Sequence, residues 1–308
     1  MAQSITIPTY CNYIEYIGSG SYGDVSKCYS TLHSQVVAVK RVKMENDFPS
    51  VPPTTLREIS ILKKLNQCFL SGAEYIVKLL DVNYDRHNLF LIFEYCETDL
   101  ELYLRNRKLS VSEAKRIFKQ LLCGLLCIHK SECVHRDIKP NNLLLKFSLH
   151  SENDNDSPTH ESPMLKITDF GLARTYTIQG QTSSNVASLW YRAPELVLGK
   201  TTYGPEIDLW AAGCVLYKLL TGKTLFQVQN EDELLEQICY VNGGYKQGKW
   251  PKEAMYRRLE EFNGMEGNTE VFGEDPDVRN LLEGLLKADP NQRMTAEQAL
   301  ECTWFDHE

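Results

Sequence analysis

The sequence predicts an α+β fold of two lobes, a small β-rich lobe with one helix and a larger α-helical lobe. Short runs rich in β-branched and aromatic residues occupy the first part of the chain, at 13–17, 36–40 and 88–93, and such runs are typical of strands. From about residue 100, apolar residues recur at the spacing of helices. We therefore assign residues 1–95 to an N-terminal lobe and residues 96–308 to a C-terminal lobe.

The helix of the small lobe follows the run PPTTLRE, residues 52–58. Proline is tolerated in the first turn of a helix but not in its interior, so the two prolines predict that the helix begins beside them. The apolar residues of one helical face are then Ile61, Leu62 and Leu65. The first turn carries two charges, Arg57 and Glu58, whose purpose becomes clear only from the rest of the chain.

Three helices are predicted in the larger lobe. Ser110 and Glu113 have the spacing of a capping box at a helix start. The apolar residues that follow on one face are Ala114, Ile117, Phe118, Leu121, Leu122 and Leu125. The segment 208–220 is apolar nearly all round, which predicts a buried central helix. A third helical stretch covers 277–288.

One segment of the large lobe differs in composition from its surroundings. Residues 150–163 are polar, acidic and proline-containing, and they lie between strand-like 143–145 and 165–167. We expect a disordered surface loop over 147–164, because such a composition cannot bury enough apolar surface to order itself. The loop holds two Ser-Pro pairs, so a regulatory insert is the alternative interpretation.

Bulk composition excludes several classes of protein. The chain has 308 residues, of which 43% are hydrophobic and 24% charged, with a net charge of −8. This is an ordinary globular composition, and the acidic balance argues against a nucleic-acid-binding surface. No stretch approaches the roughly 20 apolar residues of a membrane span, and the first residues lack the pattern of a signal peptide. We expect neither nucleic acid nor membrane as a partner.

The ten cysteines are scattered, with no CxxC pair. Cys123 and Cys127 lie one turn apart within a leucine-rich run, and we interpret them as small core residues rather than as metal ligands or a disulfide. This usage favours a reducing compartment, and we expect the protein in the nucleus, the cytoplasm or both.

A glycine-rich run, GSGSYGDV at 18–25, has the pattern GxGxxGxV. A dinucleotide-binding fingerprint would be followed directly by a helix, but the residues that follow here have a strand pattern. A glycine-rich turn between two strands can close over phosphate groups and present its backbone N–H groups to them. By itself the run favours a plain hairpin turn.

Further motifs favour the phosphate-binding interpretation. A lysine on a strand follows the turn in Val37-Ala38-Val39-Lys40, and the large lobe contains VHRDIKPNN at 134–142, DFG at 169–171 and APE at 193–195. With these motifs in this order between residues 10 and 305, the chain resembles the eukaryotic protein kinases. The resemblance implies the bilobal protein kinase fold, with ATP and Mg²⁺ as cofactors.

The resemblance also implies roles for the charged residues. Lys40 would bind the α- and β-phosphates, with Glu58 as its ion-pair partner on a helix that can swing in or out. Asn142 and Asp169 would hold magnesium, which prefers oxygen ligands.

Two further residues of the loop at 134–142 would act on the reacting groups. Asp137 would accept the proton of the incoming hydroxyl group, and Lys139 would reach the γ-phosphate.

The remaining nucleotide contacts follow from the same resemblance. Phe93 would be the gatekeeper, and the hinge would include Glu94 and Cys96. Asp99 would contact the ribose. The glycine turn would contribute Gly18, Gly20 and Gly23, and the adenine would lie between Ile17, Val25, Ala38 and Leu144.

Within the kinases, PPTTLRE and the run LWYRAPE at 189–195 resemble the cyclin-dependent kinases, in which the corresponding helix is the cyclin-binding face. A cyclin-like subunit is therefore an expected partner. Arg57, Arg136 and Arg174 would together form a receptor for a phosphate on the activation segment. In the family pattern Glu195 pairs with Arg293.

Arg192 indicates the class of substrate. In this family it holds a backbone carbonyl near the residue that follows the phosphoacceptor, so that a substrate N–H there finds no acceptor and proline is preferred. We therefore expect protein substrates with Ser/Thr-Pro sites, whose proline would contact Val186 and Ala187. Ser188 replaces the usual threonine and keeps a hydroxyl able to bridge Asp137 and Lys139.

Candidate phosphorylation sites are less sharply defined. Counting back from Ala193 favours Ser183 as the activating site, with Thr182 and Ser184 as rivals. Asn185 stands where mitogen-activated kinases need a tyrosine. In the glycine turn, Ser21 and Tyr22 match a pair whose phosphorylation would clash with ATP.

The sequence thus predicts a serine/threonine protein kinase activated by a cyclin and by phosphorylation of its activation segment. Two alternatives stay open: a related kinase that works without a cyclin, and a catalytically inactive protein with the kinase fold.

Overall fold

The computed structural model describes residues 6–20, 23–42, 51–85, 88–147, 163–175, 187–244, 250, 259, 262 and 265–306. The predicted loop at 147–164 lies outside these ranges except for its ends at 147, 163 and 164. The candidate phosphorylation sites Ser21, Tyr22 and 182–184 also lie outside them, as do Asn185 and Val186.

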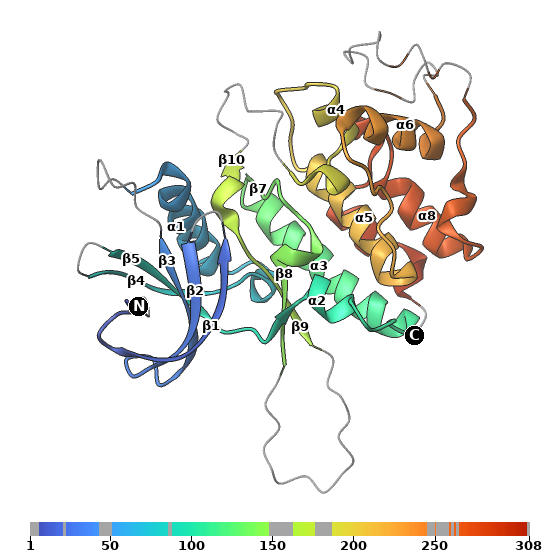
Figure 1. The fold of residues 1–308 in the computed structure, drawn as a ribbon. Coiled ribbons are helices and arrows are strands. Elements are labelled where there is room, and N and C mark those ends of the chain that lie inside the picture. The colour runs from blue at the N-terminus through green and yellow to red at the C-terminus, as the bar shows by residue number, and fades with distance from the viewer. Residues whose placement is uncertain are drawn as a thin grey trace, which may run out of the picture.

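The chain forms two lobes, a small one built on a sheet and a larger one built of helices (Figure 1), which confirms the predicted α+β class. The small lobe holds an antiparallel five-stranded sheet in the order β1-β2-β3-β5-β4. Its strands are β1 (Cys11–Gly20), β2 (Gly23–Ser30), β3 (Gln35–Val42), β4 (Leu79–Asp85) and β5 (Asn88–Glu94).

Strand β3 shows how the sheet sorts its side chains. Val37 and Val39 are buried in a cluster on one face, so their neighbours Ala38 and Lys40 point to the opposite face because side chains alternate along a strand. That opposite face belongs to the main hydrophobic core, which continues into the large lobe. The alternation therefore directs Lys40 toward the space between the lobes.

Helix α1 (Pro53–Asn66) begins with proline at its first position, as predicted from PPTTLRE. Its buried side chains recur every three or four residues and are Thr55, Glu58, Ile61, Leu62 and Leu65. The end of α1 is fixed to the sheet by Asn66, whose side chain donates to the carbonyl of Val77 at 3.2 Å and accepts from the amide of Leu79 at 2.8 Å.

The large lobe contains α2 (Leu100–Leu104), α3 (Val111–Lys130), α4 (Pro194–Val197), α5 (Glu206–Thr221), α6 (Glu231–Asn242), α8 (Pro276–Leu285) and α9 (Ala296–Leu300). The capping box of Ser110 and Glu113 starts α3, and α5 is the predicted buried central helix. Helix α8 ends three residues before the predicted 288, because Leu286 has left the helical conformation with φ −101° and ψ 30°.

Short strands place the loops between the lobes. Strands β6 (Thr98–Asp99), β8 (Leu143–Lys146) and β9 (Met164–Ile167) form a three-stranded sheet, and β7 (Cys133–Val134) pairs with β10 (Arg174–Thr175). A parallel bridge between Ile76 and Ile167 joins the segment before β4 to the end of β9. These elements bring 134–142 and 169–171 to the same edge of the large lobe.

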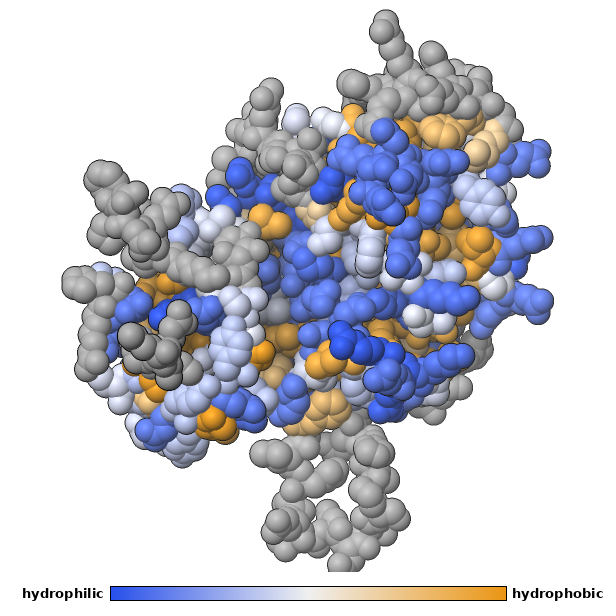
Figure 2. Space-filling view, viewed as in Figure 1, coloured by the Kyte–Doolittle hydropathy of each residue, from blue (hydrophilic) through white to orange (hydrophobic). Residues whose placement is uncertain are grey.

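The face of the large lobe seen in Figure 2 is mostly hydrophilic with scattered apolar residues, as is usual for a protein surface. None of the helices within the described ranges combines the length and the apolar character needed to cross a membrane.

Candidate active site

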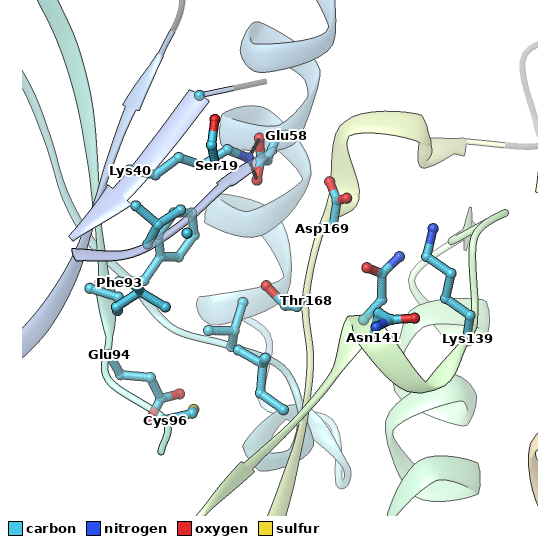
Figure 3. A pocket seen from close by; sticks show the side chains of 18 residues that line it. Ser19, Lys40, Glu58, Phe93, Glu94, Cys96, Lys139, Asn141, Thr168 and Asp169 are labelled. Carbon is cyan, nitrogen blue, oxygen red and sulfur yellow. Dashed lines mark hydrogen bonds and ion pairs between the residues drawn. The ribbon is translucent and has the colours of Figure 1, made fainter. Parts of the chain in front are cut away.

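A cavity of about 600 Å³ lies between the lobes (Figure 3), and this size suits a cofactor or small ligand. Both lobes contribute to its wall. The lining residues are Ile17, Gly18, Ser19, Gly23, Val25, Ala38, Lys40, Glu58, Val77, Phe93, Glu94, Cys96, Lys139, Asn141, Asn142, Leu144, Thr168 and Asp169.

Most of the residues predicted to bind the nucleotide line this cavity, whereas the described residues Asp99 and Asp137 do not. Gly20 ends β1. Asp99 caps helix α2, since its Oδ1 accepts a hydrogen bond from the amide of Leu102 at 2.8 Å. Asp137 lies beside the cavity, where Lys139 and Asn142 hold it.

Lys40 and Glu58 meet at the inner wall of the cavity. Lys40 Nζ donates to both carboxylate oxygens of Glu58 at 2.9 Å. Burial raises the pKa of the Glu58 carboxyl, and the charge and hydrogen bond of Lys40 offset this only in part. Because Glu58 is almost fully buried on α1, the position of that helix decides where the lysine points.

Both carboxylate oxygens of Asp137 accept hydrogen bonds. Its Oδ2 accepts from Lys139 Nζ at 2.8 Å and from Asn142 Nδ2 at 2.9 Å. Its Oδ1 accepts from the hydroxyl of Ser188 at 3.0 Å, and that same hydroxyl accepts from Lys139 Nζ at 2.9 Å. The hydroxyl of Ser188 therefore bridges Asp137 and Lys139. An aspartate fixed in this way can accept a proton at a defined position.

The loop that carries Asp137 is anchored to α5 by Asp208. The carboxylate of Asp208 accepts the amides of His135 and Arg136, each at 2.8 Å, and the ring nitrogen of His129 at 3.0 Å. Burial alone would raise the pKa of Asp208, but the hydrogen bonds and charge around it lower the pKa below its usual value. The anchor also stabilises the left-handed backbone of Arg136, with φ 72°.

Asp169 has the features of a cation ligand. Its backbone is left-handed, with φ 65°, at the start of the 3-10 helix Phe170–Leu172. Its Oδ1 is buried and has no hydrogen-bond partner in the part of the chain that the structure describes, which is costly unless a cation satisfies it. Asn142 lines the same cavity, and because its amide nitrogen donates to Asp137, its oxygen is the side-chain atom left to bind a cation. These two residues fit a magnesium ion.

The hinge is fixed through the side chain of Glu94. The carboxylate accepts from the amide of Lys78 at 2.9 Å and pairs with Lys146 at 2.8 Å and Lys166 at 3.0 Å. Burial opposes its ionisation, but the two lysines outweigh burial and lower the pKa of Glu94. At the other end of the hinge, burial raises the pKa of the Cys96 thiol to about 12, so the thiol is neutral beside the cavity.

The three predicted arginines gather beside the DFG segment. Arg57 donates to the carbonyl of Gly171 at 3.3 Å, and Arg136 donates to that of Leu172 at 2.7 Å. Burial lowers the pKa of Arg136, and the nearby charges of Arg174 and Arg57 lower it further. The Nε atom of Arg174 is buried without a hydrogen-bond partner among the described residues. Such a cluster favours binding of an anion.

A second cavity of about 310 Å³ adjoins the first and is lined by Lys139, Asn141, Ser188, Leu189, Trp190 and Tyr191. Beyond it, Arg192 donates to the carbonyl of Ala187 at 2.9 Å and pairs with Glu231 at 2.7 Å. Ala187 has a left-handed backbone, with φ 65°. Its carbonyl is turned toward Arg192.

Sequence reasoning did not identify several functional positions. Asp208, Lys146 and Lys166 act through contacts with residues far away in the chain, and no local pattern marks them. Two further cavity residues, Ser19 and Thr168, stand inside or next to motifs that were recognised. Their place next to Gly18 and Asp169 was the signal that could have found them.

Comparison with known proteins agrees with this geometry. The protein kinase domain family matches residues 11–305. The chain is 33% identical over 307 residues to "Cell division control protein 2 homolog D" of Antirrhinum majus, covering 95% of this chain and 93% of that one. It is 32% identical to "Cyclin-dependent kinase B2-1" of Oryza sativa subsp. japonica, over 95% and 89% of the two chains. It is 34% identical to "Cyclin-dependent kinase 9" of Homo sapiens, over 94% and 78%. The chain therefore belongs to the protein kinases and, among them, to the cyclin-dependent kinase family.

Proposed function

We propose that this protein transfers the γ-phosphate of ATP to serine or threonine hydroxyls of protein substrates. The observation that carries the proposal is Asp169, whose buried Oδ1 has no hydrogen-bond partner among the described residues and which lines one cavity together with Lys40, Lys139 and Asn142. Asn142 and Asp169 would hold Mg²⁺, and the ion when bound would neutralise phosphate charge.

Each residue of the site has its own role in the phosphate transfer. Lys40, directed by Glu58, binds the inner phosphates. Asp137 receives the hydrogen bond and then the proton of the substrate hydroxyl, and Lys139 offsets the charge on the outer phosphate. The hydroxyl of Ser188 fixes the side chains of Asp137 and Lys139 relative to each other. Catalysis by such a site is mainly positioning and charge stabilisation.

We further propose that the substrates carry proline directly after the phosphoacceptor. The support is the contact of Arg192 with the carbonyl of Ala187. This contact removes an acceptor that the substrate N–H of any other residue would need, and proline has no N–H to satisfy.

Activation by a cyclin-like subunit is the third part of the proposal. It is supported by the exposed Leu56 on α1, 55% accessible, and by the names of the relatives. A related kinase that works without a cyclin is the second candidate, favoured by the closed pair of Lys40 and Glu58 in the single chain. We place the activity in the nucleus or cytoplasm, a location with which ten free thiols are compatible.

The experiment that tests the transferase uses the full chain, γ-labelled ATP and a Ser-Pro peptide, with a matched Ser-Ala peptide as control. Asp169→Asn is the informative variant, because its Oδ1 makes no hydrogen bond among the described residues and the fold should survive. We expect label on the Ser-Pro peptide and a loss of about a thousandfold or more in Asp169→Asn. No label with or without added cyclins would leave the inactive kinase-fold protein as the better description.

A further inference from the structure

Two cysteines from different parts of the fold lie in direct contact. The Sγ atoms of Cys68 and Cys127 are 3.5 Å apart, although the residues are separated by 59 positions in the chain. Cys68 lies two residues after the end of α1, and Cys127 is in α3. Because a disulfide bond is about 2.0 Å long, a closing movement of roughly 1.5 Å would join the two sulfur atoms.

The backbone that carries Cys68 is seated on α3. Gly72 has a left-handed φ of +97°, and a Cβ atom there would lie 2.1 Å from the carbonyl oxygen of Cys123, so only glycine allows the loop to approach this closely. Lys64, in the last turn of α1, donates to the carbonyl of Ser131 at the end of α3, at 2.6 Å. The end of α1 and the loop after it are therefore held against α3 by contacts on both sides of Cys68.

We propose that Cys68 and Cys127 are an oxidative modification site, at which a hydroperoxide converts the two thiols into a disulfide. This inference does not rest on the proposed kinase activity. It also revises the expectation for Cys127, which the sequence suggested was only a core residue. The two cysteines are free thiols in the structure, which is the reduced form of the site.

The accessibility of the two thiols sets the order of the chemistry. Cys127 is fully buried, whereas Cys68 is partly exposed. Burial and, to a smaller extent, the contact with Cys68 raise the pKa of Cys127 to about 12. The reaction therefore begins at Cys68. Its thiolate attacks one peroxide oxygen, the O–O bond breaks, and a sulfenic acid and hydroxide result.

The second step closes the bond. Sγ of Cys127 attacks Sγ of Cys68, the S–S bond forms, the S–O bond breaks, and the departing hydroxide takes the proton of Cys127 as water. The two thiols together lose two electrons, the hydroperoxide gains them, and hydrogen peroxide would leave as two molecules of water. A dithiol reductant reverses the reaction.

The bond would connect the two lobes at the end of the helix that carries Glu58. Helix α1 carries Glu58, and the sulfur atoms are already in contact while Glu58 is paired with Lys40. Oxidation should therefore fix the C-terminal end of α1 to α3 in its present position. It should also stabilise the fold, because the link lowers the conformational entropy of the unfolded chain.

The test uses the purified full chain, fully reduced and then treated with hydrogen peroxide. Peptide mapping without reductant should give a Cys68–Cys127 cross-linked peptide that disappears on reduction, together with a rise of several degrees in Tm. Cys68→Ser should abolish both. Cys123→Ser, which removes the neighbouring thiol one turn away on α3, should retain both.

The proposal is overturned if wild-type chain yields no such cross-link, if Cys68 is driven to sulfinic acid instead, or if Cys123→Ser abolishes the bond. It is also overturned if Cys68→Ser shows the same rise in Tm on oxidation. Cys127→Ala provides a second variant that removes the buried partner, and it should leave Cys68 as a reducible sulfenic acid or a mixed disulfide with added glutathione.

Discussion

Glu195 and Arg293 form a buried, two-pronged ion pair between residues 98 positions apart. The two nitrogen–oxygen distances are 2.8 and 2.9 Å. The guanidinium also donates to the carbonyls of Glu206 and Lys287 and lies 5.2 Å above the ring of Trp210. Each charge is therefore compensated, and the pair ties the segment after Ser188 to the turn before α9.

Removing one member of this pair should destabilise the large lobe. Arg293→Met leaves the carboxylate of Glu195 buried without a counter-charge, and we expect a loss of about 3–5 kcal/mol in the free energy of unfolding. The double variant Glu195→Gln/Arg293→Met removes both charges and should cost less than the sum of the single variants. Chemical denaturation of the four proteins measures the coupling, and additive losses would contradict an interacting pair.

Replacing Glu58 should weaken nucleotide binding without lowering the stability of the fold. Its pKa is raised by burial, so folding favours the protonated form, and the stability contributed by that proton is lost as pH rises through the folded-state pKa. Glu58→Gln should therefore leave Tm unchanged or raised at neutral pH. The same change deprives Lys40 of its partner and should raise KM for ATP by about tenfold or more.

The pH profile provides the control for Glu58. In the wild-type chain, nucleotide affinity should fall as pH decreases toward the raised pKa, above the ordinary value of 4.5, because the protonated carboxyl no longer holds Lys40. Glu58→Gln should show weak binding without this dependence. An identical acid profile in both proteins would exclude Glu58 as the titrating group.

Ser188 should act on the chemical step rather than on nucleotide binding. Ser188→Ala removes the hydroxyl that joins Asp137 to Lys139, and the loss of about one hydrogen bond to a charged group corresponds to a fall in kcat of roughly tenfold. KM for ATP should change little. Ser188→Thr keeps the hydroxyl and should retain most of kcat, whereas equal losses in both variants would point to packing instead.

Arg192 should set the preference for proline. In Arg192→Lys the shorter, single-pronged donor cannot hold both the carbonyl of Ala187 and the carboxylate of Glu231. The carbonyl then becomes available to a substrate N–H, and the ratio of kcat/KM for Ser-Pro over Ser-Ala peptides should fall by about tenfold. The matched control is Glu231→Gln, which keeps the contact with Ala187, and an unchanged ratio in Arg192→Lys would refute this role.

Local features of the fold could be predicted because their signals are local. The capping box at Ser110, the proline start of α1 and the strand around Lys40 depend on residues within one or two turns or along one strand. The motifs at 134–142 and 169–171 indicated the chemistry for the same reason. The end of α8 was misplaced, since apolar spacing continues to Ala288 while the backbone leaves the helix at Leu286.

The sequence by itself predicted which residues would carry the chemistry, because short motifs specify residue types at fixed spacing. Only the tertiary structure decided which distant residues meet: that Asp208 anchors the loop of Asp137, and that Cys68 touches Cys127. Each of these contacts joins residues more than 50 positions apart. The physical reason is that distances of this kind are set by how helices and sheets pack, which no short run of residues encodes.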